Sequence, residues 1–335
     1  MTKRLIVTLI LVIAVVSMVF AAGSQGAPDS GKKVTLRLGT TNPTGELSVQ
    51  ALELAAKWAD ERSKGTLEIQ LFPASQLGSG TAMLEAASLG SLDICVDSSS
   101  YVGTFLKDRV IDSMFFTFRD KAHFRAFMQS PLNKAMEDEF RKLKGMRVVS
   151  SNWYRNPRSF VSRIAFDANS FVGMKIRVPD IKAYLESVTA MGGRCTQLAW
   201  GEVYLGLMQG VVEAAESPTD TLYDNKLHEA AKNIVLTEHL FDCLHWYMND
   251  RAWTRLSPEH QKLLAEVANE AGDWYAGRVE GNLENALKNW RDLGINVVKI
   301  DVAPLRERVA KRVAEIEAEG SQWRKGLYQE IQNIR

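Results

Sequence analysis

The sequence has few cysteines and no excess of either charge. Three cysteines occur in 335 residues, and Cys95, Cys195 and Cys243 are too far apart for a disulfide-rich scaffold or a C-x-x-C metal site. Lysine plus arginine number 41 and aspartate plus glutamate 40, so the formal net charge is +1. A protein that binds nucleic acid normally carries a basic face, and this balance gives no support for such a partner. The hydrophobic share of 46% is that of an ordinary folded protein.

Long apolar runs are also missing, except at the N-terminus. Lys3 and Arg4 precede an almost wholly apolar, uncharged run from Leu5 to Phe20, and Ala21 supplies a small residue at a signal-peptidase spacing. This pattern is typical of a cleaved secretory signal peptide and is short for a transmembrane helix. We predict a signal peptide at residues 1–21 and a flexible linker at 22–33, with an uncleaved anchor as the alternative. The rest of the chain is then expected to be a soluble, exported protein.

Motifs of the common enzyme classes are absent too. The chain has no G-x-S-x-G and no phosphate-binding G-x-x-x-x-G-K-[ST]. His228 begins H-E-A-A-K, which lacks the second histidine of a zinc-protease helix. His239 and His245 are expected on one face of one strand, where two histidines without a third ligand are more often structural. No metal or other cofactor is therefore predicted, and an exported protein without a reaction centre suggests binding rather than catalysis.

Strand and helix patterns alternate along the chain. Alternating apolar residues predict strands at 34–40 and 66–72. Helical spacing of apolar residues predicts a helix at 47–62, between these strands, and another at 81–89, after the second strand. A short apolar strand is expected at 92–96. This order favours an α/β domain with a largely parallel sheet. The pattern then starts again, with strands expected at 146–151, 159–163, 175–178 and 194–198, and helices at 180–191, with Asp180 as N-cap, and at 201–209. A second α/β unit follows, joined to the first through strands.

The clearest single element is a long helix late in the chain. Ser257-Pro258-Glu259 supplies a capping residue, a proline at the first helical position and an acid in the first turn. Helical composition continues to Leu293, and about 36 residues would span roughly 54 Å. That length exceeds one small domain, so the helix is expected to bridge two, with glycines at 272, 277 and 281 as possible bends. A strand at 295–300 and an amphipathic helix from Leu305 complete the chain.

Several ordered sequence blocks carry a resemblance to a known family. They are R-L-G-T-T-N-P at 37–43, F-P-A-S-Q-L-G-S at 72–79, G-M-K-I-R-V-P at 173–179, W-G-E-V-Y-L-G-L-M-Q-G-V-V-E at 200–213 and A-E-S-P at 215–218. In this order and spacing the chain resembles the extracytoplasmic solute-binding proteins of tripartite ATP-independent periplasmic (TRAP) transporters, the dicarboxylate-type (DctP) family. The resemblance covers nearly all of the chain after the signal peptide.

The resemblance implies two α/β lobes with a ligand cleft between them and a long helix spanning both. We expect lobe I at residues 34–155 plus 244–282 and lobe II at 156–243 plus 283–335. The implied function is capture of a small organic acid and its delivery to the small and large membrane subunits of a TRAP permease, by a protein expected to be a monomer and not an enzyme. A ligand-sensing module for a membrane receptor and a periplasmic enzyme are the alternatives.

The family implies an arginine that binds the substrate carboxylate. Arg177 lies in the G-M-K-I-R-V-P block, where relatives use this arginine for paired contacts, and a rigid guanidinium matches two carboxylate oxygens better than lysine does. By pattern alone, Lys175 and Arg177 would share a solvated strand face, which is the alternative. Arg158 corresponds to a second cleft arginine of the family, with Arg155 and Arg163 as competitors for this position.

Five further ligand-binding residues follow from the resemblance. Asp97 and Ser100 fall in the loop that lines the first lobe's side of the cleft, and sialic-acid-binding relatives carry an arginine where this chain has Ser100. Ser217 replaces a frequent asparagine, with fewer hydrogen-bond donors. Trp200 would cover the apolar part of the ligand or else pack in the core, and Asn42 belongs to the loop after the first strand. Trp153, Tyr154 and Phe160 are weaker candidates of the same aromatic kind.

Overall fold

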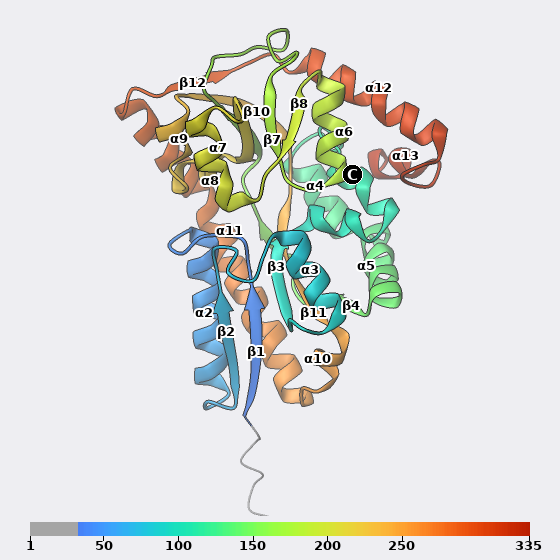
Figure 1. Cartoon of the computed structure of the whole chain (residues 1–335). Helices are drawn as coiled ribbons and strands as arrows, with labels where there is room; N and C mark the ends of the chain where they lie inside the picture. The colour runs from blue at the N-terminus through green and yellow to red at the C-terminus, as the bar shows by residue number, and fades with distance from the viewer. Residues whose placement is uncertain (1–32) are drawn as a thin grey trace, which may run out of the picture. The chain divides into compact units, whose positions relative to one another are not determined.

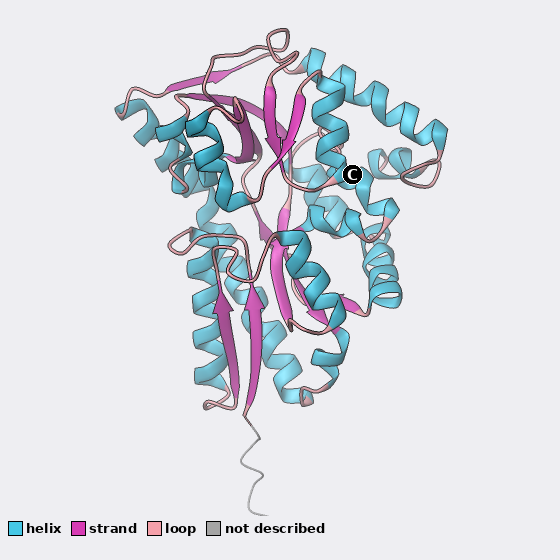
Figure 2. Ribbon diagram, in the orientation of Figure 1, coloured by secondary structure: helices cyan, strands magenta, loops and turns pink. Residues whose placement is uncertain are grey.

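The computed structural model describes residues 33–335 (Figure 1). The predicted signal peptide, and all of the predicted linker except Lys33, lie outside the described residues. Residues 35–335 form one unit by their contacts. Two β-sheets organise this unit, and helices pack on both (Figure 2). Among residues 33–335, no helix is both long enough and apolar enough to cross a membrane.

The first sheet has the strand order β2-β1-β3-β11-β4, and β5 also pairs with β11. Its strands are β1 (Val34–Gly39), β2 (Leu67–Phe72), β3 (Ile94–Ser98), β4 (Met146–Val148), β5 (Trp153–Tyr154) and β11 (Cys243–Asn249). The helices along this part of the chain are α2 (Leu47–Arg62), α3 (Gly80–Leu89), α4 (Lys121–Met128), α5 (Pro131–Lys144) and α10 (Asp250–Thr254), with short 3-10 helices η1 (Ser99–Thr104) and η2 (Lys107–Ser113). β1 is parallel to β3, whereas β11 is antiparallel to β3, β4 and β5.

The second sheet has the order β12-β10-β6-β9-β7-β8. Its strands are β6 (Arg158–Ser162), β7 (Lys175–Val178), β8 (Arg194–Gln197), β9 (Ala214–Pro218), β10 (Asn233–Leu240) and β12 (Asn296–Lys299). The helices of this part are α6 (Lys182–Met191), η3 (Trp200–Glu202), α7 (Val203–Gln209), α8 (Thr219–Asp224), α9 (Leu227–Ala230), α12 (Ala303–Glu319) and α13 (Leu327–Gln332). β6 is antiparallel to both of its neighbours, and the other pairings are parallel.

The prediction of largely parallel sheets needs a correction, because each sheet contains one strand that runs against its neighbours. These strands, β6 and β11, directly follow strands of the opposite sheet. Residues 155–157 lead from β5 into β6 and form the first crossing between the sheets. Residues 241–242 lead from β10 into β11 and form the second crossing. Each incoming strand starts where the neighbouring strands end: Leu244 of β11 pairs with Ser98 of β3, and Arg158 of β6 pairs with Pro218 of β9. The carboxyl ends of strands from both sheets therefore meet around the two crossings, the usual position of a ligand in open α/β sheets.

The long helix is confirmed and is labelled α11 (Pro258–Asp292). Its 35 residues span about 52 Å, and Ser257 caps it by accepting a hydrogen bond from the backbone N–H of His260. It contacts α2 and β5 on the side of the first sheet and α8 and β12 on the side of the second. Gly272 serves close packing, because a Cβ there would lie 2.7 Å from the Trp153 ring. The residue-level division of α11 between two lobes stays a prediction.

Two local predictions are wrong. Helix α6 starts at Lys182 with Ile181 as its N-cap, and the Asp180 carboxylate instead accepts a hydrogen bond from the Gln197 amide. His239 and His245 do not share a strand, because β10 ends at Leu240 and β11 starts at Cys243 in the other sheet. Between them the chain crosses from one sheet to the other, a change that the apolar run of the sequence does not reveal.

Candidate ligand-binding site

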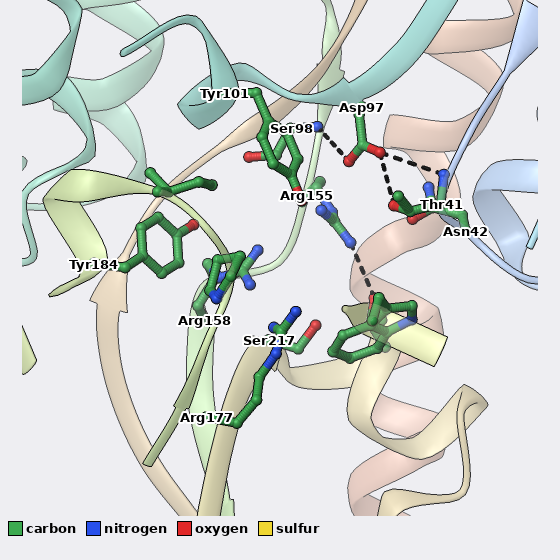
Figure 3. A pocket seen from close by; sticks show the side chains of 14 residues that line it. Thr41, Asn42, Asp97, Ser98, Tyr101, Arg155, Arg158, Arg177, Tyr184 and Ser217 are labelled. Atoms are coloured by element: carbon green, nitrogen blue, oxygen red, sulfur yellow. Dashed lines mark hydrogen bonds between the residues drawn. The ribbon is translucent and has the colours of Figure 1, made fainter. Parts of the chain in front are cut away.

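A small cavity of about 40 Å³ lies at the carboxyl ends of strands from both sheets (Figure 3). Fourteen residues line it: Thr41, Asn42, Asp97, Ser98, Tyr101, Arg155, Arg158, Arg177, Pro179, Ile181, Tyr184, Trp200, Ser217 and Thr221. A larger hollow of about 280 Å³ lies beside it and shares Thr41, Tyr101, Arg177, Pro179 and Trp200 with it. The cavity therefore continues past Arg177 and Trp200 towards the start of α3.

Arg177 supplies a buried positive charge without a counter-charge. It lies on β7 between Ile176 and Val178, and only 3% of its surface is exposed, so the alternative of a solvated strand face is wrong. Its Nε and Nη2 donate to the backbone oxygen of Leu198 at 3.0 and 2.8 Å. Within residues 33–335, no carboxylate lies in ion-pair distance of this guanidinium, and burial lowers its pKa. The Leu198 carbonyl thus fixes the orientation of Arg177 and leaves Nη1 for a ligand.

Arg158 also lines the cavity, but its guanidinium is already hydrogen-bonded to acidic side chains. Its Nε and Nη2 donate to the two carboxylate oxygens of Glu216 at 2.6 and 3.0 Å, and Nη1 donates to Asp242 at 3.2 Å. Burial by itself would raise the pKa of Glu216, but the charge and hydrogen bonds of Arg158, together with His239 at 3.5 Å, lower it to about 2. Arg158 and Glu216 are therefore a neutralised pair, in contrast to Arg177.

Arg155 reaches the cavity from the first crossing between the sheets. Its Nη2 donates to the Thr221 hydroxyl at 3.4 Å, and its Nη1 lies 3.6 Å from Oδ2 of Asp242. The same Asp242 oxygen accepts a hydrogen bond from the Ser98 hydroxyl at 2.8 Å. Asp242 belongs to the second crossing, so a single carboxylate oxygen joins both crossings to β3 of the first sheet.

Asp97 brings a carboxylate into the cavity from the end of β3. Its Oδ2 accepts from the backbone N–H and the hydroxyl of Thr41, at 3.3 and 2.7 Å, and its Oδ1 accepts from the backbone N–H of Ser98 at 2.8 Å. Burial raises the pKa of Asp97, and these three donors act in the opposite direction because they stabilise the charged form. Asn42, beside Thr41, donates its side-chain amide to the Ser48 hydroxyl.

Trp200 closes one side of the cavity and connects the two sheets. Its indole N–H donates to Oδ1 of Asn225 at 3.2 Å, and the amide of Asn225 donates to Glu46 at 3.3 Å. Glu46 precedes α2 on the side of the first sheet, whereas Trp200 and Asn225 belong to the second. Burial raises the pKa of Glu46 to about 7.

Six of the seven predicted binding residues line the cavity together: Asn42, Asp97, Arg158, Arg177, Trp200 and Ser217. Ser100 is buried outside this set, and its hydroxyl accepts a hydrogen bond from Tyr184 at 3.4 Å. The weaker candidate Trp153 is not among the lining residues; it is fully buried and donates to the Ala268 carbonyl of α11.

Eight lining residues were not among the seven: Thr41, Ser98, Tyr101, Arg155, Pro179, Ile181, Tyr184 and Thr221. Several of them directly follow or end a strand, which is the signal that could have found them. Tyr184 is different, because it belongs to α6, and no motif of the sequence marks it. Arg155, named as a competitor of Arg158 for one position, lines the cavity together with Arg158. Among the described residues, no cluster of acidic, histidine or cysteine side chains could hold a metal ion.

Comparisons with known proteins identify the family of this chain. Residues 38–319 match the family described as bacterial extracellular solute-binding protein, family 7 (DctP). The chain is 25% identical to the sialic acid-binding periplasmic protein SiaP of Vibrio cholerae, over 92% of this chain and 94% of that protein. It is 27% identical to the 2,3-diketo-L-gulonate-binding periplasmic protein YiaO of Escherichia coli, over 71% and 73%. A solved TRAP periplasmic solute-binding protein from Desulfovibrio salexigens with bound orotic acid superposes with a TM-score of 0.80 at 26% identity, over 90% of this chain and all of that one. This chain therefore belongs to family 7 of the bacterial extracellular solute-binding proteins, the DctP family.

Proposed function

We propose that the protein captures a small organic acid outside the cytoplasmic membrane and delivers it to the membrane subunits of a TRAP permease. The observation that carries the proposal is Arg177, a guanidinium that is 3% exposed, lines the cavity and has no carboxylate partner among the described residues. A buried charge is costly unless it is paired. A ligand carboxylate in the cavity supplies the missing counter-charge.

The relatives support the chemical class. SiaP and YiaO are named for the binding of sialic acid and 2,3-diketo-L-gulonate, and the Desulfovibrio protein holds orotic acid. Each of these ligands carries a carboxyl group. Their shared anionic group fits the one unpaired cation of the cavity, so the carboxylate contacts Nη1 of Arg177 on the second-sheet side.

The remaining lining residues divide between the two sheets. Thr41, Asn42 and Asp97 come from the first sheet, and Ser217 and Trp200 from the second. A ligand held by both groups stabilises the closed arrangement of the lobes, because it interacts fully only when both sides are present. Ser217 supplies a hydroxyl to the ligand, and Trp200 covers its apolar face. Membrane permease subunits then receive the closed, loaded protein.

A thermal-shift screen of the chain from residue 22 tests the proposal. Organic acids are compared with neutral sugars of similar size, and hits are confirmed by calorimetric titration. We expect only acids to raise the melting temperature, since ligand binding stabilises the folded state by mass action. The Arg177→Ala variant should fold and lose this response. A screen in which only uncharged compounds stabilise the protein contradicts the proposal.

A further inference from the structure

The charges that line the cavity are unevenly paired. Arg158 is neutralised by Glu216 and Asp242, and Asp242 also lies 3.6 Å from Arg155. Arg177 is left as the one lining arginine without an ion pair among residues 33–335. Asp97 is the one lining carboxylate, and no cation lies in ion-pair distance of it within the same residues. The cavity thus presents one unpaired positive group and one unpaired negative group.

These two groups lie on opposite sides of the cavity. Figure 3 shows Arg177, from β7 of the second sheet, across the pocket from Asp97, at the end of β3 in the first sheet. A ligand whose carboxylate contacts Arg177 therefore turns its other end towards Asp97. The geometry of the cavity makes Asp97 the group that meets the far end of the ligand.

Arg155 does not provide a free positive charge that could bind a second ligand carboxylate near Asp97. Its charge already acts on acids from both sides of the cavity: burial raises the pKa of Glu46, Asp97 and Asp220, and the charge of Arg155 lowers it in all three. Asp242 lies beside it as well. The charge of one guanidinium thus already interacts with four carboxyl groups, so it has no excess charge to offer a dianionic ligand.

Asp97 is suited to accept hydrogen bonds from the ligand. A carboxylate has about four acceptor sites, and Thr41 and Ser98 occupy three of them. A hydroxyl group of the ligand can donate to the remaining site, and the neighbouring hydroxyls of Thr41 and Ser98 offer further polar partners. A second ligand carboxylate at this place would instead lie beside the negative charge of Asp97 in a buried site. Repulsion between these two like charges disfavours binding of a diacid.

We propose that the ligand is a monocarboxylate with hydroxyl groups at its far end, and that Asp97 selects against dicarboxylates. This inference rests on the proposed function and narrows its ligand class. Asp97 acts as the specificity-determining residue, and Arg177 as the residue that binds the carboxylate. The class is that of sugar acids with one carboxyl group, in contrast to diacids of the same length.

Matched pairs of acids test the inference. D-Gluconate and D-glucarate share six carbons and their hydroxyl pattern and differ only in the terminal group, as do D-galactonate with galactarate and erythronate with meso-tartrate. Calorimetric titrations of the wild-type chain should give at least about 10-fold tighter binding of a monocarboxylate than of its diacid. Diacids that bind equally well or better, or binding confined to acids without hydroxyl groups, would overturn it.

The Asp97→Asn variant tests the assigned residue. It keeps the shape of the side chain but removes the charge, so the preference for the monocarboxylate should fall about 10-fold. Asp224→Asn removes a negative charge of α8 outside the lining set and should leave the ratio unchanged. An unaltered ratio in a folded Asp97→Asn variant excludes Asp97 as the selecting residue. Binding of diacids alone leaves the proposed function standing and overturns this inference, whereas no response to any acid removes both.

Discussion

The guanidinium carbon of Arg177 lies 5.4 Å from the centre of the Trp200 ring. The ring therefore covers one face of the cation, while the Leu198 carbonyl holds one edge. A guanidinium in this environment is both oriented and shielded from water, which strengthens its interaction with a ligand carboxylate. The two residues come from β7 and from η3, separated by a helix and a strand of the second sheet.

Replacement of Arg177 by lysine should weaken ligand binding although the charge is kept. Lysine lacks the planar group that donates to the Leu198 carbonyl on one edge and leaves Nη1 oriented for the ligand, and it loses the contact of the guanidinium with the Trp200 ring. A charged hydrogen bond contributes roughly 1.5–3 kcal/mol, so the affinity should fall about 10- to 100-fold. Calorimetric titration with the acid found in the screen measures the change.

Arg194→Lys is the matched control for Arg177→Lys, because Arg194 is exposed at the start of β8 in the same sheet. It should bind the acid as the wild type does. Wild-type affinity in the Arg177→Lys variant would mean that another residue binds the carboxylate.

Ligand binding should change the intrinsic fluorescence through Trp200. This side chain lines the cavity and donates to Asn225, so closure around a ligand alters the surroundings of its indole. Eight tryptophans contribute to the spectrum, and the Trp200→Phe variant should lose most of the ligand-dependent change. Trp253→Phe, in α10 and outside the residues that line the cavity, should keep it. An undiminished response in Trp200→Phe would separate this tryptophan from the ligand.

The carboxyl group of Glu46 should make folding stability depend on pH. Its ordinary pKa of 4.5 is raised to about 7 by burial, and Asp220 and Asp224 act in the same direction against the opposing charge of Arg155. Below pH 4.5 the group is protonated in the folded and unfolded chains and has no effect. Between pH 4.5 and about 7 the unfolded chain releases the proton while the folded chain retains it, so this group lowers stability as the pH rises.

The Glu46→Gln variant lacks this titration. Its stability relative to the wild type should increase from pH 4.5 to 7.5 by up to about 3 kcal/mol. Urea unfolding of both proteins at several pH values measures the difference. Glu53→Gln removes an exposed carboxylate of helix α2, which Glu46 precedes, and should give a difference that does not follow this pH window. A pH-independent difference for Glu46→Gln would contradict the prediction.

Two glycines of α11 should respond oppositely to alanine. A methyl group at Gly272 would collide with Asn152 and lie 2.7 Å from the Trp153 ring, so Gly272→Ala should destabilise the fold by about 1–3 kcal/mol. Gly277 has nothing within 4 Å of such a methyl group, and Gly277→Ala should stabilise the helix by up to about 1 kcal/mol. Thermal unfolding of the two variants compares them directly. Equal effects of the same sign would show that packing against Trp153 is not the cause.

Local patterns were sufficient to predict much of the secondary structure. Helix α2 spans Leu47–Arg62 as its apolar spacing indicates, and α11 begins at Pro258 after its Ser257 cap. Such features depend on neighbours within a turn or two, so the sequence contains them directly. The order of the family's sequence blocks likewise indicated the two-lobed fold, whereas the binding role that it implies for Arg177 stays a prediction. Antiparallel β6 and β11 did not follow from local patterns, because strand direction depends on which sheet the chain leaves and enters.

Only the tertiary structure decided which charged groups of the site remain available to a ligand. The sequence offers Arg177 as the carboxylate-binding arginine and Arg158 as a second cleft arginine, and no local pattern tells which of them has an acidic partner. In the fold, β9 places Glu216 against the guanidinium of Arg158, and the second crossing adds Asp242, whereas Arg177 meets a neutral carbonyl of Leu198. The reason is physical: a guanidinium is neutralised by carboxylates within a few ångströms, and these come from residues 58 and 84 positions away in the chain. The sequence by itself therefore determined the residue types, the local elements and the family, and the pairing of strands determined which arginine of the cavity has no carboxylate partner among the described residues.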